Sequence, residues 1–326
     1  MNGTKPKLEI FKPFGEAFEL MKKILFQPFD LKKWLVIGFA AFLAGHFGGG
    51  GGFSFPSPSK NFSFQTAEAA SAPNLEQWKS WLPIAIPAVI IIGLIVILLF
   101  LWLKARGNFV FTDCIVRNRG TIVAPWREYR KEGNSYFGFI LAVALGSMIV
   151  FAIMFVLFAA LGLIDFGQGK TTSVTSIGAL IFLFLFWFLF IVFVNVLTYF
   201  MPFVMYRQRC GAIDAFREVL RLITGNIGVF ILFCLFGFVL FLAMIMTGAI
   251  VSCLTCCIAA LPYAGTVILL PVYVCLRAFG LLFLRQFGPD YDVWASFMSS
   301  EFSPILAGAP PTPPSAPPPE LPSSGG

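Results

Sequence analysis

The chain has 326 residues, of which 58% are hydrophobic, 40 are Phe and only 12% are charged. So few charged side chains cannot provide a polar surface for a protein of this size in water. The composition therefore excludes an ordinary soluble domain and indicates an integral membrane protein. The formal net charge of +7 would suggest nucleic acid in a soluble protein. Here the basic residues lie beside long apolar runs, where they report membrane orientation instead, and no nucleic-acid partner is expected.

Residues 1–30 are predicted to form a cytoplasmic N-terminus with one interfacial helix. The apolar residues of this helix share one face, which we expect to lie on the membrane: Phe14, Ala17, Phe18, Met21 and Leu25. Pro28 ends the helix, and Asp30 is well placed to cap the next one.

Residues 31–286 are predicted to form a membrane domain, because long apolar runs recur along them. Six spans are expected, at about residues 31–49, 82–104, 137–164, 174–200, 227–251 and 258–284. Residues 287–326 are rich in Pro and should form a disordered cytoplasmic tail. A solvated spacer is the simpler interpretation of this tail, and a docking site for a proline-reading protein partner is the alternative.

Two basic amphipathic segments, 117–134 and 207–226, resemble each other. Each starts with Arg-x-Arg, has aromatic-Arg-Glu at its centre and ends with Gly-Asn. Residues 16–26 are a fainter copy, and about two apolar runs follow each copy. The predicted fold is therefore an all-α integral membrane protein with six transmembrane helices, built as three units of a cytoplasmic amphipathic helix plus a membrane hairpin.

The loops between the predicted spans alternate between rich and poor in Lys and Arg. Because positively charged loops stay on the cytoplasmic side, both termini are expected inside a cytoplasmic (inner) membrane. The basic residues of the amphipathic segments are expected at the membrane surface, where they would attract anionic lipids: Arg117, Arg119, Arg127, Arg130, Arg207, Arg209, Arg217 and Arg221.

Three polar residues lie within or beside the apolar runs at similar depth: Arg106, Asn195 and Arg277. An ionisable residue at membrane depth indicates a functional site. We expect the three to face one inward-opening crevice that holds an anionic lipid headgroup. The alternative is that the arginines extend to the interface for solvation.

Metal binding and catalysis find little support in the sequence. Cys253, Cys256 and Cys257 with the single His46 could offer four zinc ligands, but small residues in a tight turn explain the cysteine cluster more simply. A single His and the lack of paired carboxylates leave no recognisable general base. No metal, no cofactor and no enzymatic activity are expected.

The repeated pattern of a basic amphipathic helix and a membrane hairpin, with Arg207-x-Arg209 and Gly225-Asn226, resembles a group of multi-pass prokaryotic proteins. That group includes the membrane domain of glycerophosphodiester phosphodiesterases, whose soluble catalytic domain has no counterpart here. The resemblance implies a membrane scaffold without the hydrolase. We therefore expect a non-enzymatic component that binds lipid headgroups or partner proteins, and the alternative is a transporter or channel with an inward-facing basic crevice.

Overall fold

The structure is a computed structural model that describes residues 9–45, 75–160, 174–255 and 262–295. Every regular element in these residues is helical, so the chain is all-α as predicted. The elements are α1 (Phe11–Phe26), α2 (Leu31–Leu43), α3 (Leu75–Val116), α4 (Val123–Glu128), α5 (Arg130–Ala160), α6 (Val174–Gln208), α7 (Ala212–Gly225), α8 (Ile227–Leu254), α9 (Pro262–Ile268), α10 (Leu270–Arg285) and the short 3-10 helix η2 (Pro289–Tyr291).

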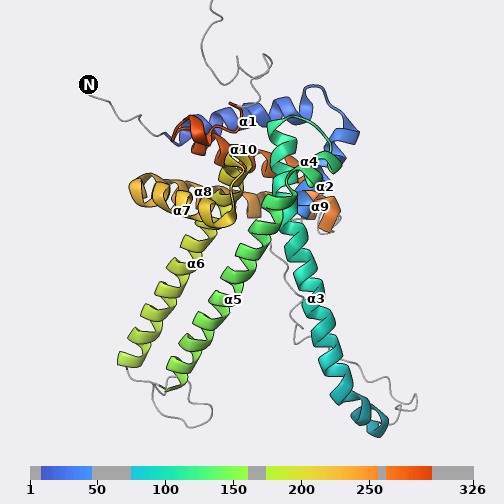
Figure 1. Ribbon diagram of the computed structural model, residues 1–326, viewed down its shortest axis with the longest axis vertical. Helices are drawn as coiled ribbons and strands as arrows, with labels where there is room; N and C mark the ends of the chain where they lie inside the picture. The colour runs from blue at the N-terminus through green and yellow to red at the C-terminus, as the bar shows by residue number, and fades with distance from the viewer. Residues whose placement is uncertain (1–8, 46–74, 161–173, 256–261, 296–326) are drawn as a thin grey trace, which may run out of the picture.

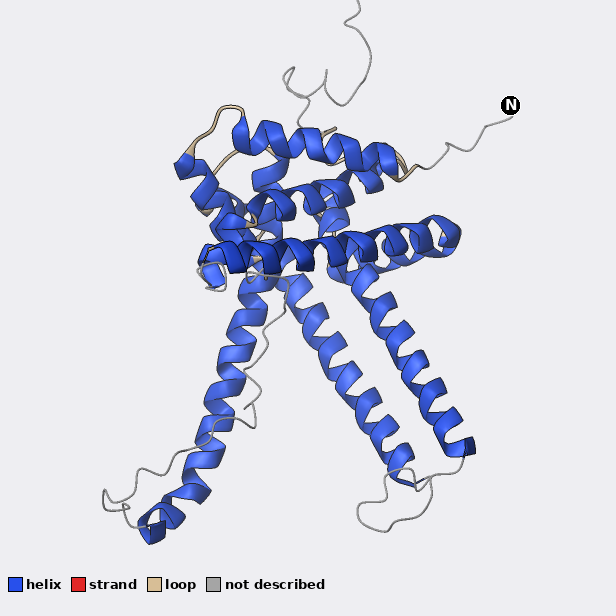
Figure 2. Cartoon of the chain, turned by 180° about the vertical axis from the view of Figure 1, so that it is seen from behind, coloured by secondary structure: helices blue, strands red, loops and turns tan. Residues whose placement is uncertain are grey.

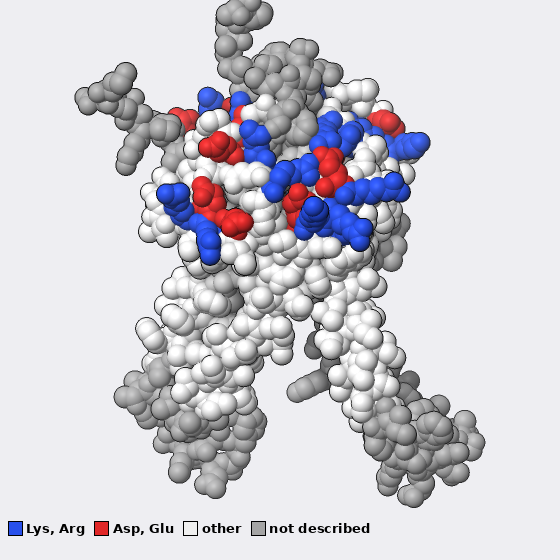
Figure 3. Space-filling view, in the orientation of Figure 1, with Lys and Arg blue, Asp and Glu red and all other residues white. Residues whose placement is uncertain are grey.

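Three long helices, α3, α5 and α6, extend in the same general direction from one packed body (Figure 1). We call the projecting parts of these helices the legs, and the packed body that contains α1, α2, α4, α7, α9 and α10 the head. The helix α8 lies across the direction of the legs in both views (Figures 1 and 2). Charged side chains gather on the head, whereas the described part of the legs is uncharged on the face shown in Figure 3.

Four helices are long and apolar enough to cross a membrane, judged by their length and composition: Ala85–Val116, Arg130–Leu157, Ile181–Gln208 and Ile227–Val251. The first three include the legs, and the fourth is most of α8. Large apolar side chains on the legs are mostly exposed, for example Val89 at 69%, Met148 at 68% and Phe184 at 71%. Such surfaces need a lipid environment, so the structure supports a membrane protein.

Two of the six predicted spans are not single long helices in the described residues. The first corresponds to α2, which has 13 described residues. The last is divided at Leu269 into α9 and α10. Pro271 explains this break, because it lacks the backbone N–H that would bond to the Val267 carbonyl one turn earlier. The indole Nε1–H of Trp34 donates to that free carbonyl at 3.0 Å, so the break joins α2 to α9.

The helix α3 is longer than predicted. The basic residues that follow the predicted span 82–104 do not end it, and the helix continues to Val116. These additional turns carry Phe109, Phe111 and Ile115, which are buried in the head. A helix that is long and apolar enough to cross a membrane thus also supplies part of the core of the head.

The helix α1 packs on α10 through the apolar face that we expected on the membrane. Ala17, Leu20 and Ile24 are fully buried, and α1 and α10 form the most extensive helix pair of the described residues. Phe18, by contrast, is 45% exposed. The expected cap of the next helix is confirmed, because the Asp30 carboxylate accepts hydrogen bonds from the backbone N–H groups of the first turn of α2.

Aromatic rings fill the junction between α8 and α10. The Phe233 ring lies 4.4 Å from the Phe283 ring and 5.1 Å from the Phe279 ring, measured between centroids. The first residues of the predicted tail also belong to the head, since η2 follows α10 and both Val293 and Trp294 are buried. Residues 296–326, with the Pro-rich stretch, lie outside the described residues.

Candidate functional site

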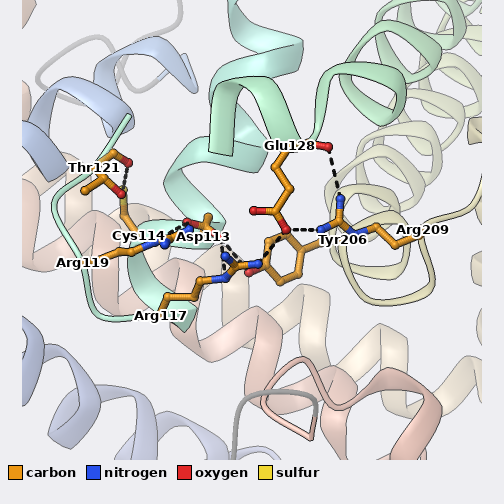
Figure 4. A network of polar contacts seen from close by, with 8 residues as sticks. All are labelled: Asp113, Cys114, Arg117, Arg119, Thr121, Glu128, Tyr206 and Arg209. Carbon is orange, nitrogen blue, oxygen red and sulfur yellow. Dashed lines mark hydrogen bonds and ion pairs between the residues drawn. The ribbon is translucent and has the colours of Figure 1, made fainter. Parts of the chain in front are cut away.

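Asp113 is the centre of a polar network in the head (Figure 4). Its carboxylate is fully buried near the end of α3. Arg117 Nε lies 3.0 Å from Oδ1, and Arg119 donates to Oδ2 from Nη2 at 3.0 Å and from Nε at 3.2 Å. The Tyr206 hydroxyl of α6 donates to Oδ1 at 3.0 Å. Two guanidinium groups and a hydroxyl thus compensate the buried charge.

Glu128 extends this network to the end of α6. Its carboxylate accepts from Arg117 Nη2 at 2.7 Å and pairs with Arg209 as well. Burial alone would raise the pKa of the Glu128 carboxyl, but the hydrogen bonds and charges of Arg117 and Arg209 outweigh it and hold this pKa below its ordinary value. The Arg209 guanidinium also lies 3.8 Å from the centre of the Tyr129 ring, and Tyr129 stacks on Tyr206.

Four of the eight arginines predicted at the membrane surface therefore hold the head together. Arg117, Arg119 and Arg209 belong to the network around Asp113 and Glu128. Arg207 donates from Nη2 to the Pro289 carbonyl of η2 at the limiting distance of 3.5 Å. Their positive charge is largely used inside the protein, so they are poor candidates for binding lipid.

The other four arginines are exposed: Arg127, Arg130, Arg217 and Arg221. None of them forms an ion pair within the described part of the chain. Two lie on α7, and the other two lie at the junction of α4 and α5. Within the described residues, these four arginines of the amphipathic segments are therefore free to meet an external anion.

The helix α7 lies along the boundary between the head and the legs. Its apolar face is buried, with Ala215 and Val219 fully enclosed. The Phe216 ring lies 5.4 Å from the Phe139 ring, which belongs to the first apolar turns of α5. The Ser135 hydroxyl accepts a hydrogen bond at 3.0 Å from the backbone N–H of the first residue of α7. The helix α7, which carries Arg217 and Arg221, therefore lies near the level at which the legs leave the head (Figure 1).

Arg106 is held between two indole rings. Its guanidinium carbon lies 4.7 Å from the Trp102 ring centre and 5.0 Å from the Trp126 ring centre. Nε donates to the Asn134 side chain at 3.2 Å. Gly133 allows this packing, because a Cβ there would meet Arg106 Cγ at 2.9 Å.

Arg277 lies in a different environment, on the α10 side of α3. It is 5% exposed, and it donates to Thr112 Oγ1 and to the Asn108 carbonyl. Arg277 and Arg106 share no hydrogen-bond partner in the described residues. Asn195 is exposed and donates back to the Ile191 carbonyl of its own helix. The three residues of the expected crevice thus bond to different partners in the described residues, and a shared crevice stays a prediction.

No group of three or more His, Cys, Asp and Glu side chains suited to a metal ion occurs in the described ranges. Cys253 is exposed at the end of α8. His46, Cys256 and Cys257 lie outside the described residues, so the zinc alternative is not addressed by the geometry.

The sequence model of a protein family described as "Family of unknown function (DUF7544)" matches residues 8–288. The match covers both the head and the legs. The chain belongs to this family. Neither a curated protein nor a solved structure gives a match. The family description assigns no function, and the resemblance to the membrane domain of glycerophosphodiester phosphodiesterases stays a prediction.

Asp113, the residue that organises the network, is not among the site residues predicted from the sequence. A usable signal was present, because Asp113 interrupts an apolar stretch four positions before Arg117, which places the two side chains on one helix face. Tyr206 had no such signal, since its partner lies 93 positions away in the sequence.

Proposed function

We propose that this protein is a non-enzymatic multi-pass membrane component that binds anionic lipid headgroups beside its head. The observation that carries the proposal is the place of Arg217 and Arg221. Both are exposed and form no ion pair with a described residue, on a helix that packs against the first apolar turns of a leg. If the legs lie in a membrane, the position of α7 at the base of the legs corresponds to the phosphate groups of one leaflet.

The basic face of α7 also carries an apolar residue at its edge. Ile213 is 63% exposed, and it lies one helical turn before Arg217. An apolar side chain beside two guanidinium groups suits the boundary between headgroups and acyl chains. The excess of Lys and Arg in the loops of the head favours the cytoplasmic leaflet of the inner membrane, with both termini inside.

The test compares two variants with equal changes in charge. The first combines Arg217→Gln and Arg221→Gln, and the control combines Lys12→Gln and Lys22→Gln on α1, which lies at the opposite side of the head from the legs (Figure 1). Native mass spectrometry of protein titrated with phosphatidylglycerol measures the affinity for the lipid.

Each basic residue near an anionic surface contributes about 1 kcal/mol. We therefore expect the α7 variant to bind phosphatidylglycerol roughly thirtyfold more weakly than the unaltered protein, and the α1 control to bind almost as well. Equal binding by the two variants would reject α7 as the lipid-binding element.

A further inference from the structure

Arg277 carries a buried charge that has no acidic partner among the described residues. Its bonded donors are Nε and Nη2, which reach Thr112 Oγ1 at 3.2 and 2.9 Å, and Nη2 also reaches the Asn108 carbonyl at 2.9 Å. Both acceptors are uncharged. Within the described ranges, no Asp or Glu forms an ion pair with this guanidinium. This contrasts with Asp113, whose charge two arginines compensate.

The surroundings of Arg277 stabilise its charge only partly. The guanidinium carbon lies 4.5 Å from the centre of the Phe203 ring, which is a favourable but weak contact. A buried cation that lacks a counter-charge is costly, and a charged residue retained at membrane depth indicates a functional site. The hydrogen bonds position the guanidinium but leave its charge to be neutralised by something else.

The side chain lies where the three leg helices meet α10. The Tyr136 hydroxyl of α5 donates to the Thr198 carbonyl of α6 at 2.8 Å, and the Tyr199 hydroxyl of α6 donates to the Leu276 carbonyl of α10 at 3.0 Å. The contacts with Thr112 add α3 to this junction. A ligand bound at Arg277 would therefore touch the point from which the legs diverge.

One amino group of the guanidinium remains available. Nη1 donates to no described residue. It is also not among the enclosed polar atoms without a partner in the described part of the chain. Arg277 is 5% exposed, and its Nη1 amino group keeps two N–H donors for a ligand oxygen.

We propose that Arg277 anchors an anion site at the junction of the legs, and that this site takes one phosphate or carboxylate group. A guanidinium that is already oriented by two acceptors presents its remaining N–H groups in a fixed direction, which suits an oxyanion. The anion could be carried by a lipid headgroup that enters between the legs, or it could be free phosphate. This site shares no residue with the α7 surface, so the two proposals can fail separately.

The first test reads the reactivity of individual arginines. Phenylglyoxal modifies accessible guanidinium groups, and peptide mass spectrometry identifies each modified Arg. The unaltered protein is placed in nanodiscs of phosphatidylcholine alone, in the same nanodiscs with inorganic phosphate, and in nanodiscs that also contain phosphatidylglycerol. Arg217 and Arg221 report the α7 surface in the same samples.

We expect Arg277 to react in phosphatidylcholine alone and to react about tenfold more slowly when the anion is present, as one charge-assisted contact would produce. Protection by phosphatidylglycerol but not by phosphate would identify a lipid headgroup, and protection by both would identify a site for either source. Protection that is absent in both samples, or an Arg277 that does not react in any sample, would overturn the site.

The second test uses Arg277→Lys, which keeps the charge but loses the planar fork. An anion that binds the folded protein should raise its melting temperature. We expect added phosphate, at constant ionic strength, to stabilise the unaltered protein and to have little effect on the variant. Equal stabilisation of the two proteins would show that the phosphate binds elsewhere.

Discussion

Arg209, which follows α6, and Glu128, the last residue of α4, form an ion pair across 81 positions of the sequence. Arg209 adopts a left-handed backbone conformation with a φ of 53°, which a residue other than Gly adopts only at some cost. The pair therefore does more than join two exposed charges. It fixes the turn between α6 and α7, and so it positions the helix that we propose to bind lipid.

Substitution of the buried carboxylate should affect stability more than substitution of the exposed one. Asp113→Asn removes the acidic partner of Arg119 and one of the two acidic partners of Arg117, and we expect a loss of about 3 kcal/mol or more in unfolding free energy. Glu128→Gln should cost about 1 kcal/mol, because this carboxylate is partly solvated. Thermal unfolding in detergent measures both. A larger loss for Glu128→Gln than for Asp113→Asn would contradict the assigned centre of the network.

The contribution of Glu128 should depend on pH. Its pKa is lower in the folded protein than the ordinary value of a glutamate, so its stabilisation is fully present above that ordinary value of about 4.3. The stabilisation is lost as the pH falls through the lowered pKa. The difference in melting temperature between the unaltered protein and Glu128→Gln should therefore be largest near neutral pH and vanish in acid. A difference in melting temperature that increased on acidification would show that the pKa of Glu128 is not lowered in the folded protein.

Gly107 permits the close approach of α2 to α3. A Cβ at this position would lie 2.4 Å from the backbone carbon of Leu43 and 2.5 Å from its oxygen. Gly107→Ala should therefore destabilise the protein by about 1–3 kcal/mol through overpacking. Gly93→Ala on the leg of α3 is the matched control, because no atom lies within 4 Å of its new Cβ. We expect this control to unfold at or slightly above the melting temperature of the unaltered protein.

The predicted orientation places the turn before α7 in the cytoplasm. Position 211 has room for a side chain, because the atom nearest to a new Cβ is Asp214 Oδ2, at the ordinary contact distance of 3.4 Å. In a background without the seven native Cys, Gly211→Cys should react with a membrane-impermeant maleimide only after the cells are permeabilised. Reaction in intact cells would place the head on the outside.

The helical class, the membrane environment and most of the long helices followed from the sequence, because apolar runs of spanning length are rare outside membranes. The end of α3 could not be predicted in the same way. Lys104 and Arg106 indicate the end of a span, but the helix continues because its next turns bury Phe109 and Phe111 against other parts of the head. Burial of this kind depends on partners that are distant in the sequence.

The repeat in the sequence predicted similar roles for segments 117–134 and 207–226, but their local structures differ. In the first, α4 has six residues and α5 begins two positions after it ends. In the second, α7 has 14 residues and a long buried apolar stripe. The shared Arg-x-Arg starts contribute to internal bonds, whereas the later arginines remain exposed. Local sequence indicates that an Arg is near a membrane surface, but it does not reveal which carboxylate the folded chain brings to it.

The depth of α7 in a bilayer decides whether this helix lies at the level of the lipid headgroups. A spin label at Ile213→Cys, in the background without native Cys, can be examined by electron paramagnetic resonance in vesicles that contain phosphatidylglycerol, with a label at Lys12→Cys as the aqueous reference. We expect the label at 213 to collide more often with dissolved oxygen than with a water-soluble nickel complex, because a site just below the phosphates favours oxygen. The label at 12 should collide more often with the nickel complex. Equal, water-like behaviour of the two labels would contradict the placement of α7 at the membrane surface.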